Sequence, residues 1–254
     1  MKYIFLTIVI LYAFVTCLSG KHEYVAKDIE LWKNTEVWDF AKCVSNNQFE
    51  KAGQLINKYH IDVDFREPKF GESLLSWAVL NENIDAVKFL IGHGADPNLH
   101  NTYNGDSPMV DAAGSFDSGE ILKYLLAHGG NPNDYVKSSE KLTYGRTRYT
   151  PLGNAVIVSL KKTKMLIEAG ADPNFASENG MTPFYWASHR LDVLEYLLLN
   201  CDLDYKKTYI VTKDTNDTLY LKELVVNNKV EYQQDSIRVR RILKVIDKKL
   251  SNIH

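Results

Sequence analysis

Acidic and imidazole side chains recur in this chain at regular intervals, and they are the side chains that act as general acids, general bases and metal ligands. Asp96 and Asp172 stand in the same five-residue phrase, GADPN, while His93 and His128 each precede the glycine of such a phrase. The phrase, however, suits a turn, because glycine ends a helix in the left-handed conformation and proline prevents the helix from resuming. We therefore interpret these acids and histidines as parts of repeated helix ends, not as a catalytic or metal site.

Other chemical signatures are absent from the sequence. It contains no CxxC pair, no cysteine–histidine zinc spacing, and neither GxGxxG nor GxxxxGK[ST]. The other histidines are scattered, so we expect no enzyme activity, no metal, no cofactor and no small-molecule substrate. Cys43 and Cys201 stand near opposite ends of the repeated region, too far apart for the roughly 7 Å that a disulfide allows.

The turn phrase is repeated at 94–98, 129–133 and 170–174, and a second signature lies upstream of each copy. That signature starts with a residue that caps a helix, usually continues with proline at the first helical position, and has alanine five residues later. Its capping residues are Ser73, Ser107, Thr150 and Thr182, its prolines are Pro108, Pro151 and Pro183, and its alanines are Ala78, Ala112, Ala155 and Ala187. Fixed periods of this size indicate stacked units.

The two signatures resemble T-P-L-H-x-A and G-A-D-x-N of the ankyrin repeat, roughly from Thr35 to Tyr205. The resemblance implies an all-α solenoid of about four to six helix-turn-helix units with atypical terminal caps. The family's histidine is replaced in every unit, which implies looser ties between adjacent turns. Its replacements are Ser76, Val110, Gly153 and Tyr185.

The expected organisation has four parts: a signal peptide at 1–20, a linker at 21–34, the repeats at 35–206 and a helical cap at 207–254. Residues 1–20 carry one charge, then an apolar run too short to span a membrane. Cleavage after Ser19 or Gly20 and lipidation of Cys17 stay open as alternatives.

The cap should contain helices at 217–228 and 236–250, the second of them basic. That basic face is either a solvated surface or a contact for an anionic membrane. The whole chain has 30 Lys and Arg against 32 Asp and Glu, so it lacks the basic footprint of a nucleic-acid-binding protein.

The resemblance implies a non-catalytic protein that binds another protein through its finger loops and concave face. The signal segment places this activity outside the cytoplasm, and signal-bearing proteins of this kind resemble those of Gram-negative bacteria, in the periplasm or cell envelope. Two alternatives are an immunity protein or inhibitor of a secreted toxin or enzyme, and a lipid-anchored envelope component.

Two surfaces are candidates for partner binding. Between Asn133 and Thr150 lie 16 residues, against 8 and 7 in the flanking units, so we expect a longer finger there, or merely a tolerated insertion. Its Tyr and Arg side chains are of the types enriched at binding hot spots: Tyr135, Tyr144, Arg146, Arg148 and Tyr149. The concave face should expose a line of apolar residues, unless some of them turn inward: Phe70, Leu80, Tyr103, Ile157, Val158 and Met181.

Overall fold

The protein was examined as a computed structural model. The structure describes residues 27–135, 150–175, 182–187, 190–204, 210–211, 218–219 and 236–251. The predicted signal peptide and most of the 134–149 insertion lie outside these ranges. The described elements are η1 (Ile29–Trp32), α2 (Trp38–Ser45), α3 (Phe49–Tyr59), α4 (Leu74–Leu80), α5 (Ile84–Gly92), α6 (Pro108–Gly114), α7 (Glu120–Ala127), α8 (Pro151–Val158), α9 (Leu160–Glu168), α10 (Pro183–Ala187), α11 (Leu191–Asn200), β1 (Ile210–Val211), β2 (Thr218–Leu219) and α13 (Ser236–Ser251).

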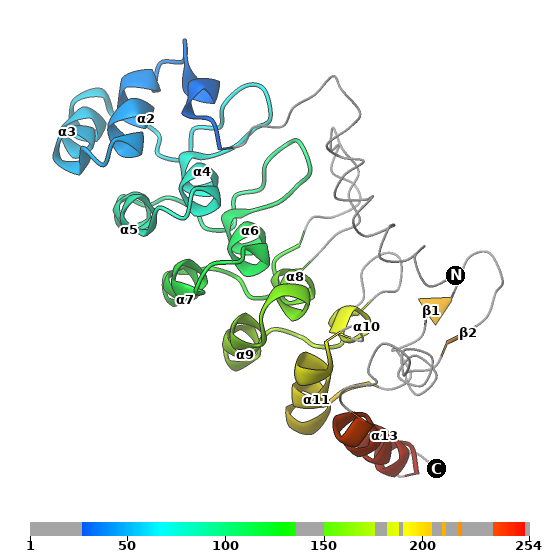
Figure 1. Cartoon of the computed structure of the whole chain (residues 1–254). Coiled ribbons are helices and arrows are strands. Elements are labelled where there is room, and N and C mark those ends of the chain that lie inside the picture. Colours follow the sequence, from blue (N-terminus) through cyan, green and yellow to red (C-terminus); the bar gives the residue numbers. More distant parts are fainter. Residues whose placement is uncertain are drawn as a thin grey trace.

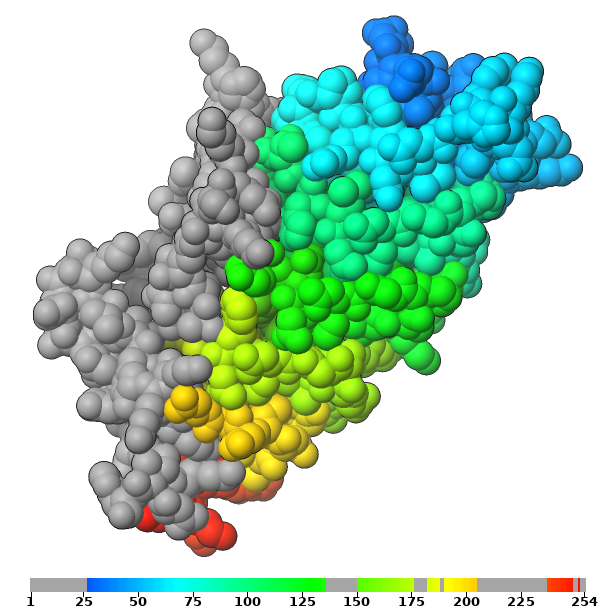
Figure 2. Space-filling model, turned by 180° about the vertical axis from the view of Figure 1, so that it is seen from behind, coloured from blue at the N-terminus to red at the C-terminus, as the bar shows by residue number. Residues whose placement is uncertain are grey.

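The helices form two parallel rows, which confirms the predicted solenoid (Figure 1). Helices α4, α6, α8 and α10 make the inner row and pack against one another in that order. Helices α5, α7, α9 and α11 make the outer row, each beside the inner helix that precedes it in the chain. From behind, the repeats follow one another as successive bands from the N-terminal to the C-terminal end (Figure 2).

The inner helices begin as the sequence predicts. The Oγ of Ser73 accepts a hydrogen bond from the Ser76 amide at 3.1 Å, and Ser107, Thr150 and Thr182 cap their helices in the same way. Each later inner helix starts with its proline, which has no N–H to leave unpaired. The four signature alanines are fully buried, and their small side chains let the inner helices approach closely.

The outer helices α5, α7 and α9 are followed by a glycine in the left-handed conformation. Gly94, Gly129 and Gly170 have φ between +91° and +93°, as predicted. At the equivalent position of the first unit stands His60, with φ of +53°. The N-terminal unit therefore keeps the backbone of the turn although it has lost the glycine.

Both ends of the array are closed by further elements. Residues 27–34, within the expected linker, pack on the first units: Trp32 is fully buried, and the Trp77 indole N–H donates to the Lys27 carbonyl at 3.0 Å. At the other end, α13 packs against α11 and buries Val239, Ile242 and Ile246. This confirms the cap helix predicted at 236–250.

The helix predicted at 217–228 is wrong at its start. Thr218 and Leu219 form strand β2, which pairs antiparallel with Ile210 and Val211 of β1. Ile, Val and Thr favour strands, and the polar residues between the two short runs allow a hairpin turn. Residues 220–235 lie outside the described ranges.

Cys43 and Cys201 are both free thiols, as their separation predicted. Within the described part of the chain, no helix has the length and apolar character needed to cross a membrane.

Candidate protein-binding surface

The turns between repeats are fixed by a ladder of side chains at one repeat position, namely Asp64, Asn98, Asn133 and Asn174. The Nδ2 of Asn98 donates to the Gly129 carbonyl at 3.0 Å, and its Oδ1 accepts from the Asn131 amide at 2.7 Å. Asn133 repeats both bonds with Gly170 and Asp172 in the next turn. These side chains therefore hold the stack together, which confirms the structural interpretation of the GADPN phrase.

The ladder also shows how the last turn is aligned. Asn174 donates to the Asp202 carbonyl and accepts from the Asp204 amide, so these two residues take the glycine and aspartate positions of the phrase. Leu203, 4% exposed, then occupies the place of the buried alanines Ala95 and Ala171.

His93 and His128 cap the ends of their outer helices. The Nδ1 of His93 lies 2.8 Å from the Phe89 carbonyl, and that of His128 lies 2.8 Å from the Tyr124 carbonyl. Because a carbonyl oxygen only accepts, each Nδ1 must donate. The His93 ring also packs on the ring of Phe89, and the His128 ring packs on the ring of Tyr124. This is the helix-end role predicted for both histidines.

The first two finger loops are tied by buried polar side chains. The carboxylate of Glu67 accepts from the amides of Lys69, Phe70 and Glu72 within 3.1 Å. The Oδ1 of Asn101 accepts three amides of the second finger, and its Nδ2 donates to Glu72 at 2.8 Å. The two fingers are therefore rigid and joined to each other.

Glu72 is the fully buried acid in this junction. Burial raises the pKa of its carboxyl group, hydrogen bonds from Ser76 and Asn101 lower it, and the nearby Asp106 charge raises it, so that the net pKa is about 8. Glu72 is therefore mostly protonated at neutral pH and links the fingers as a neutral carboxyl group.

A serine, a histidine and an aspartate meet at the base of the third finger. The Asp134 carboxylate accepts from the Ser107 hydroxyl at 2.5 Å and faces the Nε2 of His100 at 3.1 Å. The Nδ1 of His100 faces the Gly105 carbonyl at 2.7 Å. A hydrolytic triad needs the histidine to face the serine, whereas here the aspartate lies between them. The cluster therefore anchors loops and does not activate a nucleophile.

At and just beyond the C-terminal ends of the inner helices lies a set of apolar residues, exposed or partly exposed, that we call the helix-end rim. It consists of Leu80, Phe116, Ile157 and Val158. Phe116, in the connection between α6 and α7, is 88% exposed, and Ile157, in the last turn of α8, is 44% exposed. Because successive inner helices pack side by side, these residues occupy neighbouring positions along the array.

The Phe116 connection is held by a buried cation. The Nζ of Lys162 on α9, fully buried, donates to the Ala112 and Ser115 carbonyls at 2.8 and 2.6 Å and to the Ser115 hydroxyl at 2.7 Å. It also forms an ion pair with Asp117. An exposed phenylalanine thus stands on a loop that is fixed from beneath.

The residues of the predicted concave line differ in their exposure to solvent. Phe70 was expected to be exposed, but it is only 5% exposed because its ring packs edge-on against Tyr103 at 5.1 Å. Leu80, Tyr103 and Val158 are partly buried, and Ile157 is exposed. Tyr135 packs on Phe175 with 4.8 Å between ring centres. The other predicted site residues, Tyr144, Arg146, Arg148, Tyr149 and Met181, lie outside the described residues.

Sequence reasoning missed Phe116 and Lys162. A signal existed for Phe116, because Ser107 and Gly129 are separated by one residue more than Ser73 and Gly94. The extra residue falls in the α6–α7 connection. Nothing in the sequence distinguishes the buried Lys162 from the exposed Lys161 beside it.

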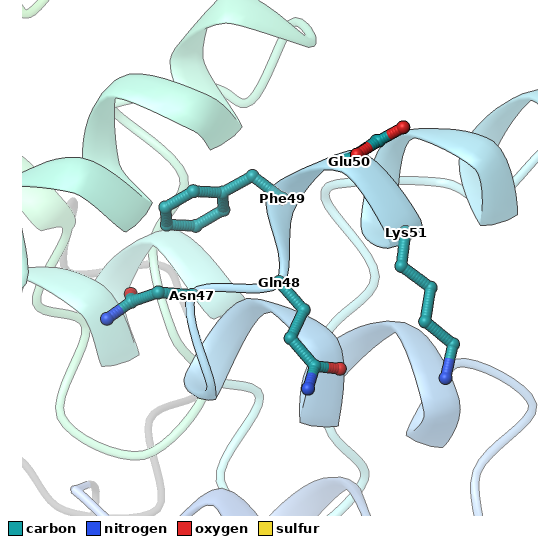
Figure 3. Close-up of a pocket in the computed structure, with 5 residues that line it drawn as sticks. All are labelled: Asn47, Gln48, Phe49, Glu50 and Lys51. Carbon is teal, nitrogen blue, oxygen red and sulfur yellow. The ribbon is translucent and has the colours of Figure 1, made fainter.

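A pocket at the turn between α2 and α3 does not have the features of a ligand site. Its lining residues come from one short segment: Asn47, Gln48, Phe49, Glu50 and Lys51. Their side chains diverge, with Phe49 directed away from Gln48 and Lys51 (Figure 3). Phe49 stacks on Phe89 and is part of the packing. The residues described by the structure contain no group of three or more His, Cys, Asp or Glu placed to hold a metal ion.

Comparison with known proteins agrees with this geometry. Residues 40–136, which span α2 to α7, match the family described as ankyrin repeats in three copies. The chain is 28% identical over 102 residues to SH3 and multiple ankyrin repeat domains protein 2 of Homo sapiens, which is 40% of this chain and 5% of that protein. It is 34% identical over 117 residues to Protein PhlB of Serratia liquefaciens, or 46% of this chain and 47% of that protein.

A third relative is matched over more of its own length. The chain is 28% identical over 138 residues to Putative ankyrin repeat protein FPV223 of Fowlpox virus, covering 53% of this chain and 86% of that protein. The chain spans less than half the length of the human and Serratia relatives.

Proposed function

We propose that this chain, of which residues 40–136 match ankyrin repeats, binds another protein without catalysis, through the finger loops and the helix-end rim. Ankyrin repeats are protein-interaction units, but a fold alone does not identify a partner. The proposal therefore depends on the surface of this chain.

The observation that carries the proposal is the exposure of Phe116 on an immobilised loop. Leaving a phenylalanine in water costs about 1.5–3 kcal/mol relative to burying it. The loop is nevertheless held in place by the buried Lys162, which makes four polar interactions to it and its flank. A rigid aromatic side chain loses little entropy on binding, which is a property of binding hot spots.

The third finger supplies the second half of the proposed surface. It carries Tyr144 and Arg146 in a locally basic stretch of an acidic chain, which would steer an acidic partner toward it. Its base is anchored at Asp134, which binds both Ser107 and His100. We propose that the finger and the rim contact the same partner.

The test is affinity capture from an envelope extract of the host, followed by affinity measurement with the purified partner. The double variant Tyr144→Ala/Arg146→Ala should weaken binding by ~2 kcal/mol or more and leave the melting temperature unchanged. Wild-type affinity in this variant would remove the finger from the proposal. Failure of the wild-type chain to retain any protein above a matched control column would contradict the binding function itself.

We propose further that the protein acts outside the cytoplasm, in the periplasm or cell envelope. The support is the sequence of residues 1–20, with one lysine, an apolar run and a small-residue exit. N-terminal sequencing and mass spectrometry of the protein from its host would test this. A chain that begins after residue 16 is expected, with an acylated Cys17 if it is a lipoprotein; an intact Met1 on the cytoplasmic protein would contradict export.

A further inference from the structure

The C-terminal helix α13 concentrates positive charge on an acidic protein. Residues 236–251 contain six Lys and Arg and one Asp, a net charge of 6 − 1 = +5. The whole chain has a net charge of −2, so the remaining residues sum to −2 − 5 = −7. The charge of this chain is therefore strongly segregated onto its last helix.

Packing determines which residues of α13 face water. Val239, Ile242 and Ile246 are buried on the side that packs against α11. Ile237, Arg241, Lys244 and Lys248, spaced at i, i+4, i+7 and i+11, share the opposite side, and Arg240 lies beside them. We call the four cations, Arg240, Arg241, Lys244 and Lys248, the basic stripe.

Few acids offset the basic stripe. Arg241 is 61% exposed while its guanidinium pairs with Glu195, which also pairs with Arg238. Arg240, Lys244 and Lys248 are exposed, and no ion pair with another described residue is found for them. Ile237, at the start of the same face, is 74% exposed. Helix α13 lies at the C-terminal end of the array, and no further helix of the described chain follows it there (Figure 1).

We propose that the basic stripe of α13 is a docking surface for the anionic headgroups of a lipid bilayer. The observation that carries it is charge complementarity along a straight face. Cations spread over about 12 Å of helix match a flat layer of phosphates. The stripe has neither an aromatic residue nor a concave surface, which a specific protein contact would use.

The packing of α13 also sets the mode of contact. Its apolar face is covered by α11, so the helix cannot immerse that face in the bilayer as a free amphipathic helix does. Contact is therefore peripheral, with the long Lys and Arg side chains reaching the headgroups and Ile237 alone entering the interface. Such binding is reversible and screened by salt.

The test is co-sedimentation of the full chain with vesicles of phosphatidylcholine, with and without about 30 mol% phosphatidylglycerol. With about fivefold gained per unpaired cation, the three cations together should make the anionic vesicles bind roughly 100-fold more tightly. Reversal of three cations, Arg240→Glu/Lys244→Glu/Lys248→Glu, should remove this preference, and so should about 0.5 M salt. The apolar run at 3–15 is common to all variants and both vesicle types, so its contribution cancels.

The matched control reverses three exposed lysines, one each on α3, α5 and α7, Lys51→Glu/Lys88→Glu/Lys123→Glu, with the same change in net charge. It should lose less than half of the preference. Equal loss in both triple variants would overturn the proposal, because net charge and not the stripe would then decide binding. Circular dichroism shows whether each variant is folded, and the neutral variant Arg240→Gln/Lys244→Gln/Lys248→Gln repeats the test if charge reversal disturbs α13.

Three further results would also overturn the proposal. The first is equal binding of the wild-type chain to neutral and anionic vesicles. The second is competition by inorganic phosphate beyond that of sodium chloride at equal ionic strength, which would indicate a site for a free anion. The third is self-association of the wild-type chain without vesicles, lost on reversal of the stripe, which would assign the stripe to a second copy of the chain.

Discussion

Asn133 and Gly170 are 37 residues apart in sequence, and the side-chain amide of Asn133 donates a 2.9 Å hydrogen bond to the Gly170 carbonyl. The same side chain accepts from the Asp172 amide at 2.7 Å. One asparagine thus forms hydrogen bonds with two backbone groups in the turn of the next repeat, the Gly170 carbonyl and the Asp172 amide. Each repeat is fixed to its neighbour through such a pair of bonds, in addition to the packing of the helices.

Asn133→Ala should lower the free energy of unfolding by about 1–2 kcal/mol, because two backbone groups lose their partner. Urea unfolding followed by circular dichroism measures this change. The control is Asn200→Ala, since the Asn200 side chain is exposed and donates within its own helix, to Tyr196. Similar losses in the two variants would show that the ladder adds nothing to the stack.

Gly94→Ala should destabilise the protein by about 1 kcal/mol, because φ of +93° is unfavourable for any residue with a Cβ. No atom lies within 4 Å of the added Cβ, so backbone strain is the whole cost. Two residues earlier, Gly92 ends α5 with an ordinary helical backbone and open space around it. Gly92→Ala should therefore stabilise by roughly 0.5 kcal/mol. Thermal melts that move in the same direction for both variants would contradict the assignment of Gly94 as the helix stop.

Lys162→Met should lower the free energy of unfolding by about 3 kcal/mol or more, since Asp117 and two carbonyls lose a buried partner. The neighbouring Lys161 is exposed and donates only to the Ser118 carbonyl. Lys161→Met should thus change stability by less than about 0.5 kcal/mol. Equal effects of the two substitutions would show that the buried charge does not hold the loop.

The ion pair of Lys162 and Asp117 also predicts a pH dependence. Burial alone would raise the pKa of the Asp117 carboxyl, but hydrogen bonds from Lys162 and Ser115 and the Lys162 charge lower it overall. The pair therefore contributes fully above the unfolded-state pKa, and this contribution is lost as the pH falls through the lower folded-state pKa. Stability of the wild-type chain should decline in this acid range, and Lys162→Met should show less of that decline.

Glu72 predicts the opposite pH dependence. Its folded-state pKa of about 8 exceeds the ordinary value of 4.5, so the folded chain binds one proton more than the unfolded chain between these values. This contribution to stability is fully present below pH 4.5 and is lost as the pH rises to about 8. Glu72→Gln keeps an uncharged acceptor for Asn101, and it should stabilise the protein by a few kcal/mol at pH 8. The free energy of unfolding is measured for both proteins between pH 5 and 8. If it changes with pH by the same amount in the two proteins, Glu72 is not a buried neutral group.

The sequence predicts the repeating parts of the fold because each depends on local chemistry. Ser107 caps a helix and Gly129 follows the end of one. Both features can be predicted because the capping bond and the left-handed turn depend only on residues nearby in sequence. The same locality fails for the hairpin at Thr218, where pairing with Val211 decides the structure. Short apolar runs fit a helix or a strand equally well.

The candidate surface could be predicted only in outline. Phe70 and Ile157 were both predicted from the sequence as exposed apolar residues. Phe70 is buried because it packs against Tyr103 in the neighbouring finger, whereas Ile157 stays exposed. Lys162 has the pattern of a solvated helix residue, and only the fold brings Ser115 and Asp117 to it. These positions are buried or exposed according to residues of other repeats. Those residues are far away in sequence, and the repeat pattern does not show which of them will make contact.

The most direct test of partner binding compares two exposed aromatic residues on different faces. Tyr59, at the end of α3, is 60% exposed. Like Phe116 on the helix-end rim, it can be replaced by alanine without removing a buried side chain. Both Phe116→Ala and Tyr59→Ala should leave the melting temperature within about 2 °C, since neither side chain is buried. Affinity of each variant for the captured partner is then measured by isothermal titration. Phe116→Ala should weaken binding about 30-fold with Tyr59→Ala near wild type, whereas wild-type affinity in Phe116→Ala would contradict the helix-end rim as the binding surface.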